Sequence, residues 1–528
     1  MRRSLIPDRS TRMRGQESTP LPMTTNAVSP VLRAAASLAV LAGLLAMPLL
    51  ASAQNAFSPG GTDYAIAGAL AGDQTAPHAA VSANGGFLVW QDNAVNNYGL
   101  RIRAQRLGSA LTQSLTPFVV SSVAGSSSAG DQEKPQVAML NNGGAVFVWQ
   151  GGKYGFQKIY ARFMNTNGAF ITSDIQVNTY TKSFQVNPGV ATLADGSVVV
   201  VWASDGQDGD MQGIFAQRLS ATGAKLGGEF QINQWTAKNQ RTPAVTALAN
   251  TNFVVAWVSE LQRGSSTVDI YARIFNSAGV AVGSEFPVNP STSNMCANPV
   301  VAASPQGGFA IAWSQKDDPV LTAGSLDGVL VAPVQTSRST NSWDVFGRVL
   351  NADGTAASDA ICLNTTRYGD QFGPKLCAMG RNYLAVWTSL GQDSSREGVY
   401  GQFLTSDGRL AGVEFRVNTT TVSRQIHPTI ASDGLNRFLV TWSSFVAGTS
   451  FDLFARSYDL IRLQMTAVPQ GARLSWNTQP GLVYQVQTST DAATWSNFGS
   501  PRTAAAYSDS FTVSPAGGKA FYRVIRTQ

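Results

Sequence analysis

The sequence predicts an all-β fold, a seven-bladed β-propeller with its N-terminal strand closing blade seven, followed by a small β-sandwich-like module. Two observations carry this prediction. A unit anchored by a proline and a later tryptophan recurs seven times, and its segments show no helical periodicity. The strand that the last unit lacks is found ahead of the first unit. At 528 residues the chain is long enough for two domains, each with its own core.

The start of the chain has the pattern of an export signal. Arg33 precedes an apolar run over residues 34–50, and a small-x-small triplet follows at Ala51, Ser52 and Ala53. We therefore expect residues 1–53 to be a signal peptide cleaved before Gln54, with 1–22 an over-extended start. An uncleaved anchor is the alternative. No later stretch is long enough to span a bilayer, so we expect a protein that is secreted, displayed on the cell surface or held in the periplasm.

Charge and cysteine content exclude several classes of protein. Residues 1–53 hold six arginines against one aspartate and one glutamate, so the rest of the chain carries 32 basic and 30 acidic side chains. Such a balance offers no basic patch for nucleic acid. Three cysteines are too few for a disulfide-built scaffold, so packing must hold the core. We expect a monomer.

The repeat is regular in its spacing. Proline and tryptophan lie 13 or 14 residues apart in every unit, and most units follow one another after about 55 residues. The pairs are Pro77/Trp90, Pro135/Trp149, Pro188/Trp202, Pro243/Trp257, Pro299/Trp313, Pro374/Trp387 and Pro428/Trp442.

Each unit reads as four short strands separated by turn residues. In the third unit these are 188–193, 197–202, 213–219 and 229–233, with β-branched and aromatic residues between Gly, Asp and Asn turns. Second strands such as 253–257 are apolar at every position, so both of their faces must be covered. Blades packed between neighbouring blades satisfy this requirement without a helix.

The seventh unit ends after its third strand, near Ser457. Residues 63–67 precede Gln74 by the same count that 414–418 precede Gln425. We therefore expect residues 62–67 to supply the fourth strand of blade seven, which removes an exposed sheet edge.

The repeat, with a P-x-V-A…V-V-x-W core and a G-x-E-F-x-V-N tail, resembles that of bacterial secreted β-propeller proteins over roughly residues 60–460. This resemblance implies the fold and an extracellular setting and transfers no catalytic residue. We place the propeller at 54–460. Residues 461–528 contain further strand patterns and resemble small fibronectin type III-like modules at the C-terminal ends of exported bacterial proteins.

Function at one site must come from residues that break the repeat. The largest break is an insertion between the second and third strands of blade five, from about residue 316 to Trp343, which contains Asp317 and Asp318. Long loops on a rigid scaffold often carry recognition. These three residues are candidate ligand-binding residues, although a merely tolerated insertion is equally compatible with the pattern.

Two histidines, His78 and His427, flank the first prolines of blades one and seven, which adjoin in a closed ring. They are candidates for a ligand site near the channel mouth. The alternative is that they are hydrogen-bonded turn residues.

Blade three offers a candidate calcium site. Asp205, Asp208 and Asp210 lie in a Gly-rich loop, and calcium prefers several hard oxygen ligands. The spacing does not match an EF-hand loop, so a solvated turn is the alternative. We expect no other cofactor.

Six units also have a glutamine three residues before the proline, where blade five has Cys296. A ring of amides could bind a polar ligand, but hydrogen bonding between blades is the structural alternative. The glutamines are Gln74, Gln132, Gln185, Gln240, Gln371 and Gln425.

These features favour a secreted or cell-surface scaffold protein that binds glycan or protein partners through the propeller rim and is not an enzyme. One alternative is a polysaccharide-active hydrolase or lyase, which needs two carboxylates about 5–10 Å apart in the channel or a histidine, tyrosine or metal centre. Acidic residues are scarce in the first strands that line the channel. A purely structural envelope protein is the second alternative.

Overall fold

The computed structural model describes most of the chain after residue 55. The described ranges are 56–59, 62–93, 99–111, 116–122, 130–292, 294–316, 342–380, 382–434, 436–478, 483–492, 494–506, 508–514 and 520–527. The chain divides into residues 1–52 and 53–528, and everything described belongs to the second unit. No helix among the described residues is long and apolar enough to cross a membrane.

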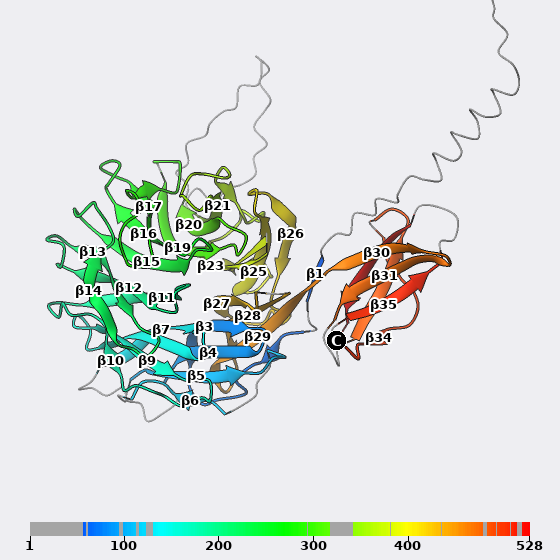
Figure 1. Cartoon of the computed structure of the whole chain (residues 1–528), viewed down its shortest axis with the longest axis horizontal. Coiled ribbons are helices and arrows are strands. Elements are labelled where there is room, and N and C mark those ends of the chain that lie inside the picture. The colour runs from blue at the N-terminus through cyan, green and yellow to red at the C-terminus, as the bar shows by residue number, and fades with distance from the viewer. Residues whose placement is uncertain are drawn as a thin grey trace, which may run out of the picture. The chain divides into compact units, whose positions relative to one another are not determined.

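The described residues form seven antiparallel blades around a common centre, as predicted (Figure 1). Blade one contains β3 (Gln74–Ser82), β4 (Gly85–Asp92), β5 (Arg101–Leu107) and β6 (Phe118–Val119). Blade two contains β7 (Asp131–Met139), β8 (Ala145–Gly152), β9 (Lys158–Met164) and β10 (Ile175–Gln176). Blade three contains β11 (Gln185–Thr192), β12 (Val198–Asp205), β13 (Gln212–Leu219) and β14 (Lys225–Gln231). Blade four contains β15 (Gln240–Ala247), β16 (Phe253–Glu260), β17 (Val268–Phe275) and β18 (Phe286–Pro287). Blade five contains β19 (Met295–Ala303), β20 (Phe309–Lys316), β21 (Trp343–Leu350) and β22 (Ile361–Cys362). Blade six contains β23 (Gln371–Met379), β24 (Asn382–Leu390), β25 (Glu397–Thr405) and β26 (Leu410–Arg416). Blade seven contains β27 (Gln425–Ser432), β28 (Arg437–Val446) and β29 (Ser450–Ile461). A single parallel pair, Val268 with Met295, links the sheets of blades four and five.

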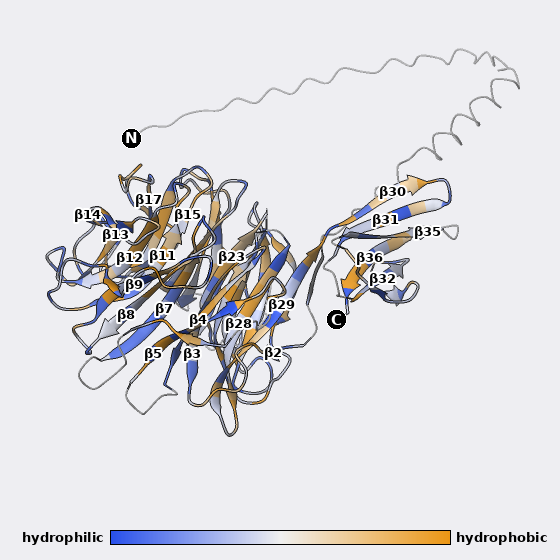
Figure 2. Cartoon of the chain, turned by 60° about the horizontal axis from the view of Figure 1, so that its bottom comes forward, coloured by the Kyte–Doolittle hydropathy of each residue, from blue (hydrophilic) through white to orange (hydrophobic). Residues whose placement is uncertain are grey.

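The second strands are covered on both faces, as their composition requires. Along β12, Val198 and Trp202 pack with residues of blade two, while Val199 and Val201 pack with residues of blade four. Hydrophobic stretches therefore fall inside the propeller strands (Figure 2). All seven repeat tryptophans are fully buried, so burial between blades supplies the main stabilisation.

The N-terminal strand closes the ring, as predicted. β2 (Tyr64–Ala65) pairs with β29, and the Ile66 amide donates to the Leu453 carbonyl at 3.1 Å. The carboxylate of Asp63 accepts backbone N–H groups of Thr419 and Thr420 at 3.1 and 3.3 Å.

Two features of blade seven were not expected. An additional segment, β1 (Ala56–Pro59), pairs with residues 458–461 of β29. The third strand consequently runs on past Ser457 to Ile461, and Ile461 packs into the core of the C-terminal module.

The C-terminal module consists of two small sheets. One contains β30 (Leu463–Val468), β31 (Gly471–Asn477) and β35 (Ser508–Val513). The other contains β32 (Val483–Ser489), β33 (Ser496–Asn497), β34 (Arg502–Thr503) and β36 (Phe521–Arg526). Leu474, Trp476, Tyr484 and Val486 are among the buried side chains of its core. Its relationship to fibronectin type III modules remains a prediction.

Glutamines that precede the repeat prolines make the same hydrogen bonds in different blades, which favours a structural role for them. The Gln240 amide donates to the Ala237 carbonyl at 2.9 Å and accepts from the Asn233 amide at 3.1 Å. Gln371 makes the same two kinds of contact, with Tyr368 and Asn364. These side chains therefore hold the connections between blades.

Candidate functional site

The candidate site is built from a β-bulge at the start of each first strand. In blade three, Val186 pairs with Ala203 and Gly189 pairs with Val201, so Asn187 and Pro188 together face Trp202. The same register shift occurs in all seven described blades. The proline and tryptophan of the repeat are thus the two sides of one bulge. Proline suits such a position because a bulged residue gives up its ladder hydrogen bond.

The residue before each proline adopts a positive φ, between 49° and 62°. These residues are Ala76, Lys134, Asn187, Thr242, Asn298, Gly373 and His427. Six of them are not glycine, and left-handed backbone costs such residues roughly 1–2 kcal/mol each. A strained conformation retained in every blade is characteristic of positions where the backbone must present particular groups.

All seven of these residues line one cavity of about 440 Å³ on the propeller axis. Gln91 and Thr388, which follow the tryptophans of blades one and six, also line it. Thr75 is paired with Gln91 near the start of β3, so the cavity lies toward the end where blade-to-blade connections and second-to-third-strand loops meet. We call this end the connection rim.

Neighbouring blades fix several bulges by hydrogen bonds. The N–H of Lys134 donates to Gln91 Oε1 at 2.8 Å, and the N–H of Asn187 donates to Gln150 Oε1 at 2.8 Å. The N–H of Gly373 donates to Ser314 Oγ at 3.0 Å. Each acceptor directly follows the tryptophan of the preceding blade, so the ring itself positions the cavity wall.

The cavity wall is chemically one-sided. Immediately before or after the prolines, blades six, seven, one and two carry Lys375, His427, His78 and Lys134, and all of these except His78 line the cavity. Blades three, four and five carry only neutral residues there. Those that line the cavity are Asn187, Thr242, Asn298 and Val300. We call the lining residues of the first group the basic arc and those of the second the neutral arc.

The basic groups influence one another. Burial lowers the pKa of Lys375, and the positive charge of Lys134 lowers it further. Burial also lowers the pKa of His427 to about 4, with further contributions from Lys134, Lys375 and Arg424. His427 is therefore a neutral imidazole at pH 7, whereas the charges of the two lysines repel each other.

The two histidines have different surroundings. Nδ1 of His78 accepts the N–H of Val137 at 3.2 Å, and burial lowers its pKa to about 3. His78 thus holds the first strand of blade two, as in the structural interpretation, and does not belong to the cavity lining. His427 does line the cavity.

Among the described residues, Glu133 is the one carboxylate in the cavity lining. Its Oε2 accepts from Gln150 Nε2 at 3.1 Å. A glycoside hydrolase that uses two carboxylates needs a second one opposite the first, and the described lining does not supply it.

The three aspartates proposed for calcium are each engaged elsewhere. Asp205 accepts from Ser183 at 2.6 Å, Asp208 from the Asn233 amide at 3.1 Å, and Asp210 from the N–H of Lys238 at 2.8 Å. Burial raises the pKa of Asp208. No cluster of three or more metal-ligating side chains occurs in the part of the chain that the structure describes. The geometry therefore lends the calcium prediction no support.

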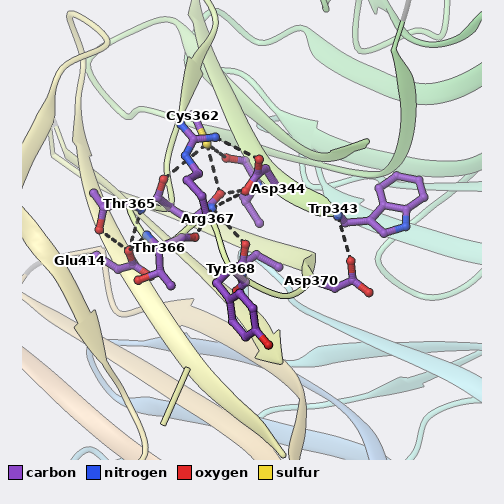
Figure 3. Close-up of polar contacts among 12 residues, drawn as sticks. Trp343, Asp344, Cys362, Thr365, Thr366, Arg367, Tyr368, Asp370 and Glu414 are labelled. Carbon is purple, nitrogen blue, oxygen red and sulfur yellow. Dashed lines mark hydrogen bonds and ion pairs between the residues drawn. The ribbon is translucent and has the colours of Figure 1, made fainter. Parts of the chain in front are cut away.

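Trp343 begins β21 at the connection rim, away from the cavity lining. Its N–H donates to Asp370 Oδ1 at 3.0 Å, which ties blade five to the connection into blade six (Figure 3). Beside it, Arg367 donates to Asp344 at 3.0 Å (Figure 3). Asp317 and Asp318 lie outside the described residues.

The connection rim also carries exposed aromatic rings. Tyr154 and Phe156, in the loop between β8 and β9, are 94% and 66% exposed. Tyr368 and Trp235, in connections between blades, are 71% and 39% exposed. All four rings therefore lie in loops of the same rim as the cavity, although none of them belongs to its lining.

Several cavity residues were missed in the sequence, above all Lys134, Lys375 and Glu133. The signal lay beside the repeat prolines. Aligning the seven units on proline places basic residues next to it in four blades that are consecutive around the ring, and neutral residues in the other three.

Known proteins offer a likeness of fold only. No family model and no curated protein matches the chain. Among solved structures, a protein of unknown function from Dyadobacter fermentans is 11% identical, with a TM-score of 0.42 over 62% of this chain and 94% of its own. An α-L-arabinanase from Penicillium chrysogenum, complexed with arabinobiose, is 15% identical, with a TM-score of 0.40 over 62% and 92%. Polysaccharide lyase Uly1 is 8% identical, with a TM-score of 0.43 over 78% and 98%.

Proposed function

We propose that this protein binds polysaccharide, either as an enzyme that acts on it or as a non-catalytic binder. It holds a saccharide chain across the connection rim, with part of the chain in the cavity on the propeller axis. The observation that carries the proposal is the combination of exposed aromatic rings with a polar cavity at the same rim.

The two components suit the two faces of a sugar. Sugar rings present C–H faces that pack against aromatic rings such as those of Tyr154, Trp235 and Tyr368. Their hydroxyls need donors and acceptors, which Asn187, Thr242 and Asn298 of the neutral arc can supply. A concave site with a few polar groups is the usual form of a small-molecule or saccharide site.

The proposal covers both a polysaccharide-active enzyme and a non-catalytic binder. Glu133 alone does not provide the carboxylate pair of a hydrolase. His427 also lines the cavity and could accept a proton in a cleavage reaction, because its lowered pKa leaves the imidazole unprotonated at pH 7. We therefore expect any cleavage to use His427 as the proton acceptor rather than a pair of carboxylates.

Binding is tested first, by affinity electrophoresis of the purified protein in gels containing a panel of plant and algal polysaccharides. Tyr368→Ala and Trp235→Ala should each weaken binding roughly fivefold or more, about 1 kcal/mol, as expected for an aromatic contact at the centre of an interface. Val280→Ala is the matched control, because Val280 is exposed on the opposite rim, in the turn before β18. Unchanged mobility with every polysaccharide, or equal losses with Val280→Ala, would refute the carbohydrate rim.

Turnover is tested second, with the polysaccharides that bind. New reducing ends or ultraviolet-absorbing unsaturated ends that disappear in His427→Gln would support an enzyme. Binding without either product would leave the protein as a scaffold that binds glycan.

A further inference from the structure

The charges of the cavity point to a ligand more specific than a neutral sugar. We propose that the channel mouth recognises an acidic saccharide, whose carboxylate or sulfate group is held by Lys375 and Lys134 of the basic arc. This inference rests on the proposed carbohydrate site and deepens it by naming the class of saccharide.

The first support is the position of Lys375. It follows Pro374 on β23 and pairs with Val386 directly after the bulge. The equivalent residues of blades three, four and five are Gly189, Ala244 and Val300. None of the other six blades has a lysine at this inner position, so the scaffold does not require one.

The second support is that no acidic side chain among the described residues forms an ion pair with either lysine. The ion pairs of the described residues are all made by arginine, and none includes Lys375 or Lys134. Glu133, the carboxylate in the described lining, is instead hydrogen-bonded to Gln150. Lys375 is half-buried, and the positive charge of the exposed Lys134 makes its own charge less favourable. An anion that joins the two ammonium groups would relieve this repulsion.

The third support is space. Blade six has Gly373 at the bulge, where the other blades have a side chain. A Cβ atom placed there would meet no atom within 4 Å. The wall beside Lys375 is therefore open, which leaves room for an anionic group to approach the ammonium.

The arrangement also gives the ligand an orientation. An anionic group would face blades six, seven, one and two, while uncharged hydroxyls would face Asn187, Thr242 and Asn298. A saccharide ring with its charge on one side fits this division, whereas a uniformly charged inorganic ion uses only half of the wall.

The test compares ligands that differ only in charge. Binding of an oligogalacturonate to the purified protein is measured by isothermal titration calorimetry against its fully methyl-esterified form, which keeps the sugar rings and loses the carboxylates. A sulfated neutral oligosaccharide and its unsulfated parent form a second pair, which distinguishes a carboxylate from a sulfate. We expect at least one charged member to bind roughly tenfold more tightly than its neutral partner, about 1.4 kcal/mol.

Variants of the two lysines test where the charged group of the saccharide binds. Lys375→Met keeps the apolar stem and should remove most of that tenfold preference, as should Lys134→Met to a smaller extent. Lys238→Met is the control, because Lys238 is exposed on the same rim and lies outside the cavity lining. The preference should also shrink as salt is raised, since salt screens the attraction.

The outcomes separate this inference from the proposed function. Equal binding of charged and neutral partners that is still lost in Tyr368→Ala would refute the acidic class and leave the carbohydrate rim standing. A charge preference that survives Lys375→Met and Lys134→Met, or that falls equally in Lys238→Met, would refute the placement in the channel. Failure of every saccharide to bind would refute both.

Discussion

The residues beside the seven prolines differ from blade to blade, and several of them line the cavity. The proline and tryptophan keep the bulge and the core, so they recur in every blade, whereas their neighbours are free to differ. Lys375, Lys134, His427 and Glu133 occupy these variable positions in the cavity lining. A repeat fold can therefore carry a single asymmetric site without any change to its scaffold.

A buried tryptophan of the repeat should contribute strongly to stability. Trp202→Ala removes a side chain that is fully buried between blades two and three and should cost about 3–5 kcal/mol, because the cavity left behind cannot close. Thermal unfolding followed by circular dichroism measures the loss. Trp235→Ala is the control, since Trp235 is 39% exposed and its removal should change stability by less than about 0.5 kcal/mol. Equal effects of the two variants would contradict burial as the source of stability.

His78 should make the protein less stable in acid. Its folded-state pKa is about 3, below the value of about 6.5 for an unfolded chain. As the pH falls below 6.5 the unfolded chain takes up a proton that the folded protein does not, so stability is lost. The loss from this residue is at most about 1.4 kcal/mol per pH unit. Between pH 7 and pH 4, His78→Gln should therefore lose less stability than the wild type, as measured by thermal midpoints. Parallel curves would show that folding does not lower the pKa of His78.

At the scale of elements, the ring is closed by the same contacts that join consecutive blades. Asp63 accepts two backbone N–H groups after the fourth strand of blade six, as Glu229 does for blade two and Glu414 does for blade five. The first strand of the propeller, β2, therefore takes the place of the missing fourth strand of blade seven, and Asp63 makes the contact that a glutamate makes in other blades. The outer edge of β29 is thus paired along β2.

If the contacts of Asp63 and Glu229 are equivalent, removing either carboxylate should lower the stability of the protein by a similar amount. Asp63→Ala and Glu229→Ala each leave two backbone N–H groups of the preceding connection without their acceptor, so each should cost about 1–3 kcal/mol. Thermal unfolding of both variants tests the prediction. If Glu229→Ala is destabilising and Asp63→Ala is not, the N-terminal strand does not hold the ring together.

At the scale of the whole molecule, every described strand lies after the expected cleavage site before Gln54. The first is β1, which begins at Ala56, and β2, which closes the ring, begins at Tyr64. Cleavage at the expected site would therefore keep every described strand in the chain.

Export should yield a chain that begins at Gln54. Expression of the full-length gene in a bacterium with a general secretory pathway, followed by N-terminal sequencing of the exported protein, tests this prediction. Retention of residues 34–50 on a membrane-bound product would instead identify an uncleaved anchor. Replacing Ala51 and Ala53 by bulky residues should block cleavage if the triplet is the site.

Much of the fold was predictable because each blade repeats a local pattern. The Pro77/Trp90 type of pair set the number of blades, and the apolar run at 253–257 required cover on both faces. The count from residues 63–67 to Gln74 placed the closing strand. By contrast, β1 and the extension of β29 to Ile461 were missed, because their pairing depends on segments about 400 residues apart that share no repeat pattern.

The candidate site was less predictable for a related reason. His427 was singled out in the sequence and does line the cavity, whereas His78, Trp343 and the three aspartates of blade three make contacts elsewhere. Lys134 and Lys375 are 241 positions apart in the chain, and neither lies in a local motif. Their importance comes from a shared cavity, which no spacing along the chain expresses.

The number of blades, their strand order and the closure of the ring could all be predicted from the amino-acid sequence, because hydrophobic periodicity and turn residues act locally and recur in every unit. Which side chains meet on the axis depends instead on how the blades pack around it. The bulge turns one residue per blade toward the cavity, and the ring brings blades two and six to opposite sides of blades seven and one. Charge and desolvation act through space rather than along the chain, so the basic arc exists only once the ring has closed.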